Sequence, residues 1–237
     1  MLSGRRILVV VPARGGSAGI PLKNLREVGG VPLVARVGHL VRALDFVDRA
    51  IVSTDHPEIA RTAEAAGLAV PFVRPDALSG PTIGDQQVLE HALLETERLD
   101  RAQYHVIIML QPTSPSRTAV QVRDTVTMLI DGGHDAVWTV SRTDGKSHPL
   151  KQLAIGANGA LDYYDPAGAS ITARQQLTPV FHRNGIAYAF TRDCLLDQKT
   201  IMGAKTGALV IDGPIANIDT EFDLEFADWL LSRTGRS

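Results

Sequence analysis

The sequence contains a single cysteine and few aromatic residues. Cys194 has no second cysteine with which to form an internal disulfide, which fits a protein of a reducing compartment. Aromatic residues make up 5% of the chain, too few for a platform on which nucleic-acid bases could stack. The net charge of −2 argues against nonspecific binding to nucleic acid or to a membrane surface.

Long apolar runs and metal-ligand spacings are also missing. The apolar run Ile7–Val11 follows Arg5 and Arg6 but is too short for the core of a signal peptide or for a membrane span. The seven histidines show no His-x-x-x-His spacing, and there is no Cys-x-x-Cys pair, which argues against a zinc site. We therefore expect a cytoplasmic protein that binds neither nucleic acid nor a membrane.

The remaining composition is that of a globular protein with a sizeable core. Of the 237 residues, 44% are hydrophobic and 21% charged. Apolar spacing predicts alternating strands and helices, hence a Rossmann-like, mostly parallel sheet. The expected strands are Ile7–Val11, Ala50–Ser53, Ala69–Val73, Val106–Leu110, Ala136–Val140, Ala187–Phe190 and Leu209–Ile211, and the expected helices include 56–66 and 85–98.

Helix starts are predicted from capping residues. Asp55 with Glu58 fits a capping box for the helix over 56–66, and Thr118 with Gln121 fits another. In the final helix we expect a buried apolar face, made of Phe222, Phe226, Trp229 and Leu230.

The pattern changes between about residues 142 and 184. Helical periodicity disappears there, and Asn158-Gly159 is typical of a hairpin turn between two short strands. The stretch also carries polar residues that a core does not need, among them Lys151, Arg174 and Gln175. We interpret it as a small β-rich excursion from a single domain that spans residues 1–237.

A basic, glycine-rich loop follows the first strand. It carries Arg14, Gly15, Ser17 and Lys23. Because glycines let backbone N–H groups approach an anion and the basic side chains add charge, the loop predicts a nucleotide-triphosphate cradle at the carboxyl end of the strand. The alternative is an ordinary surface turn with solvated basic residues.

Two motif alternatives fit this loop less well. The Gly-Lys-Ser/Thr ending of a Walker loop is missing. Gly15 to Gly19 match the Gly-x-Ser-x-Gly elbow of hydrolases, but Pro21 disfavours the helix that the elbow requires directly after Ser17. A second polar loop, Gln111 to Arg117, follows another buried strand and is expected at the same edge of the sheet.

Several segments in this order and spacing resemble the CMP-sialic acid synthetases (acylneuraminate cytidylyltransferases). The resemblance covers nearly the whole chain. It rests on Pro-Ala-Arg-Gly-Gly-Ser-Ala-Gly-Ile-Pro-Leu-Lys-Asn (12–24), Val-Ser-Thr-Asp (52–55), Leu-Gln-Pro-Thr-Ser-Pro-Ser-Arg (110–117), His-Pro-Leu-Lys (148–151), Arg-Gln-Gln-Leu (174–177), Asn-Gly-Ile-Ala-Tyr (184–188) and Ile-Asp-Thr-Glu-x-Asp (218–223).

The resemblance implies an α/β nucleotidyltransferase that joins a 2-keto sugar acid to CTP, releasing pyrophosphate. It implies a homodimer formed through the excursion, with Phe181 at the interface, and a Mg²⁺ cofactor held by Asn217 and Asp219. The expected catalytic residues are Arg14, Lys23, Gln111 and Asp219. The nucleotide would contact Arg14, Gly15, Ser17, Lys23 and Asn24, and the acidic acceptor would contact Gln111, Lys151, Arg174, Gln175, Asn184 and Tyr188. Asp85 is a candidate for an extra nucleotide contact because it follows Thr82 at the start of a predicted helix, not because of the resemblance.

Two residues depart from the family pattern. Ala18 stands where a lysine is usual, and Asn217 stands where the first of two aspartates is usual. Both changes remove charge from the triphosphate–metal site, and Asn217 should lower its affinity for magnesium. The alternatives to a sugar-acid acceptor are therefore CMP transfer to another acidic acceptor, such as a phosphonate, and a non-catalytic nucleotide-binding protein.

Overall fold

The computed structural model describes residues 1–16 and 19–234, and it divides into two compact units. The first unit contains Met1–Thr139, Asn184–Leu209 and the chain from Gly213 onward. The second contains Val140–Arg183 and Val210–Asp212, close to the excursion expected at 142–184. Three strands, β6 (Ala136–Arg142), β9 (Phe181–Thr191) and β10 (Thr206–Val210), have residues in both units.

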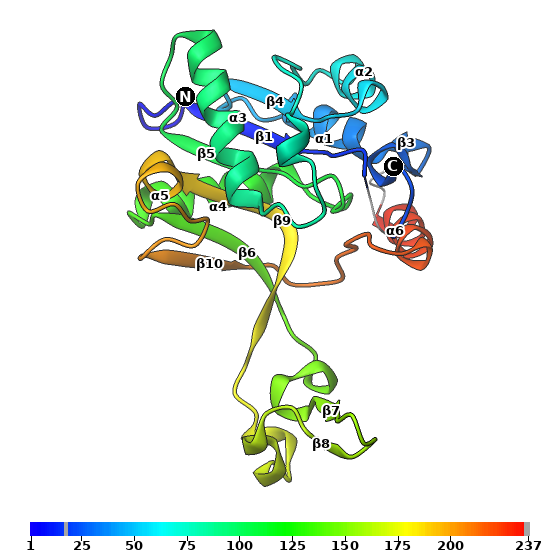
Figure 1. Ribbon diagram of the computed structural model, residues 1–237. Helices are drawn as coiled ribbons and strands as arrows, with labels where there is room; N and C mark the ends of the chain where they lie inside the picture. Colours follow the sequence, from blue (N-terminus) through cyan, green and yellow to red (C-terminus); the bar gives the residue numbers. More distant parts are fainter. Residues whose placement is uncertain (17–18, 235–237) are drawn as a thin grey trace. The chain divides into compact units, whose positions relative to one another are not determined.

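The central sheet has the strand order β10-β6-β9-β5-β1-β4 (Figure 1). Strand β1 (Ile7–Pro12) pairs in parallel with β4 (Arg49–Ser53) and with β5 (Val106–Met109). Strand β9 runs antiparallel to β5. The expected α/β, Rossmann-like fold is therefore confirmed, as a mixed sheet.

Helices bury both faces of this sheet. Ile7, Val9 and Val11 share one core cluster with residues of α1 (Leu33–Val41), α2 (Pro57–Ala65) and α4 (Ala119–Asp131). Leu8 and Val10 belong to another cluster, with residues of α3 (Asp85–Asp100) and α5 (Arg192–Leu196). Because alternate residues of β1 face opposite layers, both sets must be apolar, which explains the continuous run.

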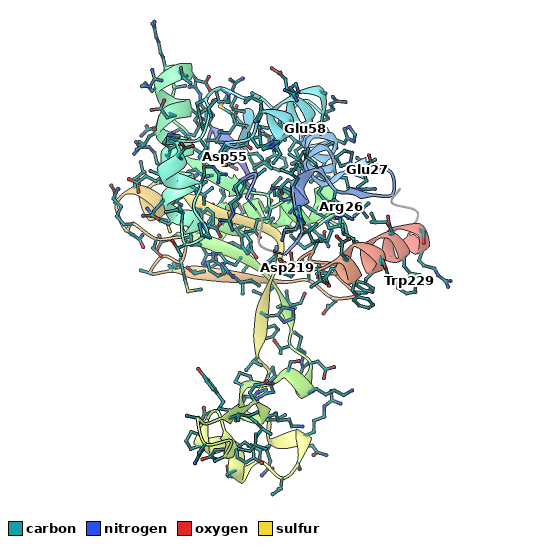
Figure 2. All side chains as sticks on the ribbon, turned by 45° about the vertical axis from the view of Figure 1, so that its right-hand side comes forward. Arg26, Glu27, Asp55, Glu58, Asp219 and Trp229 are labelled. Carbon is teal, nitrogen blue, oxygen red and sulfur yellow. The ribbon has the colours of Figure 1, made fainter. Side chains whose placement is uncertain are left out.

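The C-terminal helix α6 (Glu221–Thr234) packs on a third cluster, together with the short ribbon of β2 (Glu27–Val28) and β3 (Val31–Pro32). Its buried residues are Leu224, Ala227, Leu230 and Leu231. The predicted apolar face was wrong in part, since Phe222 is 72% exposed and Trp229, labelled in Figure 2, is 53% exposed.

Two other expectations were wrong. Ala69–Val73 is not a strand of the sheet: Ala69 forms an isolated parallel bridge to Ile51, and Val73 is exposed. Pro71 has no N–H to donate to a ladder, which limits pairing beyond that bridge. Helix α2 is capped by His56, whose Nδ1 accepts from the Glu58 N–H at 3.3 Å, rather than by Asp55. The capping box of Thr118 and Gln121 on α4 is confirmed.

The second unit is built from short elements. Strands β7 (Leu153–Ile155) and β8 (Leu161–Tyr163) form the predicted hairpin, and Gly159 takes the positive φ of 78° that its turn needs. Both strands are exposed throughout, and of this unit's described residues His148 and Gly168 alone are buried.

None of the helices in the part of the chain that the structure describes has both the length and the apolar character of a membrane span.

Candidate active site

A cavity of about 230 Å³ lies at the carboxyl ends of β1 and β5. The chain runs beyond both strands into polar loops there, as the sequence analysis expected. The cavity is lined by Pro12, Arg14, Lys23, Asn24, Arg74, Leu78, Gly80, Ile83, Asp85, Val88, Gln111, Pro112 and Thr113. Five of the predicted site residues are therefore brought together: Arg14, Lys23, Asn24, Asp85 and Gln111.

The loop after β1 is held by side chains from other elements. Asn24 is buried, and its Nδ2 donates to the Arg14 carbonyl at 2.9 Å. The Gly15 N–H donates to Asp55 Oδ1 at 2.8 Å. The guanidinium of Arg14 donates from Nη1 to the Gly80 carbonyl at 2.7 Å. The Gly15 N–H, expected to face a phosphate, is thus already bonded to a carboxylate.

Lys23 connects this loop to the segment before α6. Its Nζ donates to the Ile218 carbonyl at 2.8 Å and to Asp219 Oδ1 at 2.9 Å. Gly19 lies against the same segment, where a Cβ would come within 2.5 Å of the Asp219 carbonyl oxygen. The basic loop and the distant aspartate therefore meet.

Asn217 and Gln111 both lie near Gly185. A Cβ on Gly185 would come within 3.5 Å of Asn217 Oδ1 and 3.6 Å of Gln111 Oε1. The Ile218 N–H donates to the carbonyl of Thr113, a cavity residue, at 2.9 Å. The segment that carries Asn217 and Asp219 is therefore docked on the loop after β5.

Arg117 holds that second loop. It is buried, and it donates to the Gln111 carbonyl at 2.6 Å, to the Gly185 carbonyl at 2.9 Å and to the Ile186 carbonyl. Burial lowers its pKa to about 9. At neutral pH it remains a cation that joins the strand end of β5 to β9.

Arg74 is a cavity residue that the sequence analysis missed. It is 3% exposed, and its Nε donates to Ser53 Oγ at 3.0 Å. Burial lowers its pKa to about 10, with Asp55 opposing the shift. Its position in a polar loop after an expected strand was the available signal, but Arg-Pro is an ordinary turn composition.

Asn184 and Tyr188, predicted to contact an acceptor, are buried in the first unit. Asn184 Oδ1 accepts from Thr139 Oγ1 at 2.7 Å and from the Ile186 N–H at 3.1 Å. The Tyr188 hydroxyl accepts from the Gly185 N–H at 2.9 Å. These contacts shape the Gly185 turn beside Gln111.

The other predicted acceptor residues lie in the second unit. Lys151, Arg174 and Gln175 are exposed there. Arg174 lines a small cavity of about 100 Å³ together with Arg142 and His148. Ser17, predicted on the nucleotide, and Ala18 lie outside the described residues.

Asp219 and Asn217 are the oxygen donors predicted to bind a metal. Both are exposed, and the side chain of Asp219 is 74% exposed. Within residues 1–16 and 19–234 no group of three or more His, Cys, Asp or Glu side chains is arranged to hold an ion. One carboxylate and one amide oxygen suit Mg²⁺ when phosphate oxygens and waters complete its octahedron.

The sequence matches one protein-family model and several individual proteins. The family model described as cytidylyltransferase matches residues 8–228. The chain is 26% identical over 226 residues to "Post-translational flagellin modification protein B" of Campylobacter coli, covering 95% of this chain and 94% of that protein. It is 29% identical over 224 residues to the CMP-N,N'-diacetyllegionaminic acid synthase of Legionella pneumophila, covering 94% of each.

The fold has a counterpart among solved structures. A CMP:2-keto-3-deoxy-manno-octonic acid synthetase complexed with CTP superposes with a TM-score of 0.68 at 19% identity, covering 97% of this chain and 99% of that one. At this level of identity the match supports the fold.

Proposed function

Because the chain belongs to the cytidylyltransferase family, we propose that it transfers CMP from CTP to the hydroxyl of a sialic-acid-like 2-keto sugar acid, releasing pyrophosphate. It is a nucleotidyltransferase. The observation that carries the proposal is the cavity at the ends of β1 and β5, whose lining includes the three cations Arg14, Lys23 and Arg74.

The residues that line this cavity suit a nucleoside triphosphate. Arg14 and Lys23 supply positive charge for the phosphates, and developing charge on the leaving pyrophosphate would be stabilised by the same groups. Leu78, Ile83 and Val88 provide apolar walls for a base. Arg74 lines the same cavity and donates to Ser53 from Nε and Nη2. Its remaining N–H groups are donors of the kind that match the carbonyl and ring-nitrogen acceptors of cytosine.

A magnesium ion would be held by Asp219, by Asn217 and by the phosphates. Bound there, it would neutralise charge on the triphosphate and help to orient it. Asp219 is engaged with Lys23 through one oxygen, Oδ1, and its side chain is otherwise exposed. Because the protein offers few ligands, we expect the ion to bind together with the nucleotide.

The acceptor hydroxyl would approach the α-phosphorus from the side of Gln111. The second unit, taken by itself, exposes Lys151 and Arg174, with Gln175 as a neighbour. These are cations of the kind that pairs with a carboxylate, and we propose that they bind the carboxylate of the acceptor. Asn184 and Tyr188 act indirectly, by shaping the Gly185 turn against which Gln111 lies.

We further propose that the protein is a cytoplasmic homodimer and that the second unit forms the interface. Leu153, Ile155, Leu161 and Tyr164 are between 52% and 75% exposed, and Phe181 is 47% exposed. A two-stranded hairpin with no buried face is only marginally stable by itself. A second copy of the chain would cover these side chains.

The test is pyrophosphate release from CTP and Mg²⁺ in the presence of single acceptors. The panel includes N,N'-diacetyllegionaminic acid, pseudaminic acid, N-acetylneuraminic acid and 3-deoxy-manno-octulosonate, together with a phosphonate. We expect release with at least one sugar acid, and a CMP-sugar of matching mass.

The same panel separates the alternatives. Release with the phosphonate and with none of the sugar acids would replace the sugar-acid proposal by CMP transfer to another acidic acceptor. CTP binding without release on any acceptor would indicate a non-catalytic nucleotide-binding protein.

A further inference from the structure

We propose that Asp55 is a positioning residue for Arg14, acting through the peptide group that joins Arg14 to Gly15. This inference rests on the proposed function, because it takes Arg14 to contact the triphosphate. Asp55 is expected from sequence to cap α2, but His56 performs that task, which leaves the Asp55 carboxylate for the loop.

The sheet brings Asp55 and Gly15 together. Pro12, the last residue of β1, lies opposite Ser53, the last residue of β4, and the Ala13 N–H donates to the Ser53 carbonyl at 3.0 Å. The segments that follow β1 and β4 therefore leave the sheet side by side. Asp55 lies two residues beyond one strand and Gly15 three residues beyond the other.

Both polar atoms of one peptide group are bonded to side chains. The carbonyl of the Arg14–Gly15 peptide accepts from Asn24 Nδ2 at 2.9 Å, and its N–H donates to Asp55 Oδ1 at 2.8 Å. A rotation of this peptide plane would break both hydrogen bonds. This peptide plane is bonded directly to the Arg14 Cα. Fixing the plane therefore restricts the direction of the Cα–Cβ bond, from which the Arg14 side chain extends.

The glycines make such a clamp necessary. Gly15 lies so close to His56 that a Cβ would come within 2.9 Å of its Cδ2, which excludes a larger residue. A Cβ on Gly16 would meet nothing within 4 Å. Glycine has the widest choice of backbone conformations, so a loop with two consecutive glycines loses more entropy when ordered than one without.

The turn that carries Asp55 is itself held from the cavity. The Arg74 N–H donates to the Thr54 carbonyl at 2.8 Å, and the Arg74 side chain donates to Ser53. The Thr54 hydroxyl accepts from the His56 N–H at 3.1 Å. These hydrogen bonds hold the turn on both sides of Asp55, which is labelled in Figure 2. The Asp55 backbone is therefore held independently of its bond to Gly15.

The experiment measures CTP turnover in Asp55→Ala and Asp55→Asn, each alone and combined with Arg14→Ala. Asp55→Ala removes the acceptor of the Gly15 N–H and should lower kcat/KM for CTP by about tenfold or more. Asp55→Asn retains an oxygen acceptor and should recover most of that loss. In the Arg14→Ala background, Asp55→Ala should have little further effect, because the residue through which it acts is gone. Asp131→Ala, an exposed aspartate on α4, is the matched control.

Hydrogen exchange of the Gly15 amide gives a readout that does not depend on activity. The amide should be protected in the wild type and in Asp55→Asn, and should exchange faster in Asp55→Ala. Equal loss of turnover from Asp55→Ala with and without Arg14 would overturn the inference, as would an unchanged Gly15 exchange rate. If turnover is absent in the wild type, the same cycle is run on CTP dissociation constants. A wild type that neither turns over nor binds CTP refutes the proposed function and this inference with it, whereas additive effects with an active wild type refute the inference alone.

Discussion

Lys23 and Asp219, which are 196 residues apart in the sequence, form an ion pair of 2.9 Å at the edge of the cavity. The lysine side chain is 15% exposed and the aspartate side chain 74%. Lys23 is therefore the cation that Asp219 contacts in this structure. The proposed metal would have to share this carboxylate with Lys23.

Replacing Lys23 should strengthen metal binding in the absence of nucleotide. Lys23→Gln removes a positive charge from Asp219, and an ion pair with an exposed partner is worth up to about 1 kcal/mol, so the dissociation constant for Mn²⁺ should fall by about two- to fivefold. CTP should bind more weakly at the same time. Electron paramagnetic resonance of added Mn²⁺ measures the first effect. Lys199→Gln, which breaks the exposed pair with Glu90, is the control. Unchanged or weaker Mn²⁺ binding in Lys23→Gln would contradict the prediction.

Asn217→Asp should tighten the metal site further. The substitution adds a second carboxylate beside Asp219 and raises the negative charge available to the ion. We expect the Mg²⁺ concentration for half-maximal activity to fall by about tenfold, equivalent to ~1.4 kcal/mol. A titration of pyrophosphate release against Mg²⁺ measures it, with Asn217→Ala as the comparison. A metal dependence that is the same in all three proteins would exclude residue 217 from the site.

Lys151→Ala should weaken binding of the acceptor without changing binding of the nucleotide. Loss of the cation that we propose for the acceptor carboxylate should raise the acceptor KM by about tenfold. The KM for CTP should stay the same, because the nucleotide cavity is lined by other residues. Lys146→Ala removes a neighbouring lysine of the same unit and should change neither constant. An equal rise in both KM values after Lys151→Ala would indicate a structural effect.

The buried thiol should be unreactive in the folded protein. Burial raises the pKa of Cys194 to about 11, and Asp135 contributes to the rise. At pH 8 about one thiol in a thousand is then a thiolate. Ellman's reagent should therefore label the native protein very slowly, and should label one thiol per chain after denaturation, since Cys194 is the only cysteine. Rapid labelling of the native protein would show that the α5 region opens readily.

The sequence predicted the fold well wherever one local pattern had a single solution. Strand β1 is apolar at every position from Ile7 to Val11 because helices cover both faces, and the Thr118 capping box is a contact between neighbours in sequence. Local patterns failed where two solutions were equally good. In α6, Phe222, Phe226 and Trp229 have helical spacing, but so do Leu224, Ala227 and Leu231, which are buried together with the correctly predicted Leu230.

Contacts between distant segments decided the rest of the site. Both Asp55 and His56 can cap a helix, and only the proximity of Gly15 shows that Asp55 is used elsewhere. Arg74 looks like a turn residue until the turn is folded against Ser53. The roles of Lys23, Asn24 and Asp219 were suggested by the resemblance. The Lys23–Asp219 ion pair and the hydrogen bond from Asn24 to the Arg14 carbonyl required the structure.

Arg117→Met should destabilise the protein and also impair the site. The guanidinium is buried and donates to the carbonyls of Gln111, Gly185 and Ile186. Methionine keeps an unbranched apolar stem but has no donors, so buried carbonyls would lose their partners at a cost of about 1–3 kcal/mol each. We expect the free energy of unfolding, measured with urea, to fall by at least about 3 kcal/mol.

The two loops that Arg117 joins carry Gln111 and the Gly185 turn, so activity measured where the variant is still folded tests the link to the site. There the KM for the acceptor should rise even though Arg117 itself is buried. Arg117→Lys, which retains charge but cannot reach three carbonyls with one planar group, should fall between the wild type and Arg117→Met in both measurements. Full acceptor affinity in a folded but destabilised Arg117→Met would show that the second loop holds its shape without the arginine. The Arg117 contacts would then play no part in positioning Gln111. The hydrogen bond from the Gly185 N–H to the Tyr188 hydroxyl would be the remaining contact that we propose to shape the turn beside Gln111.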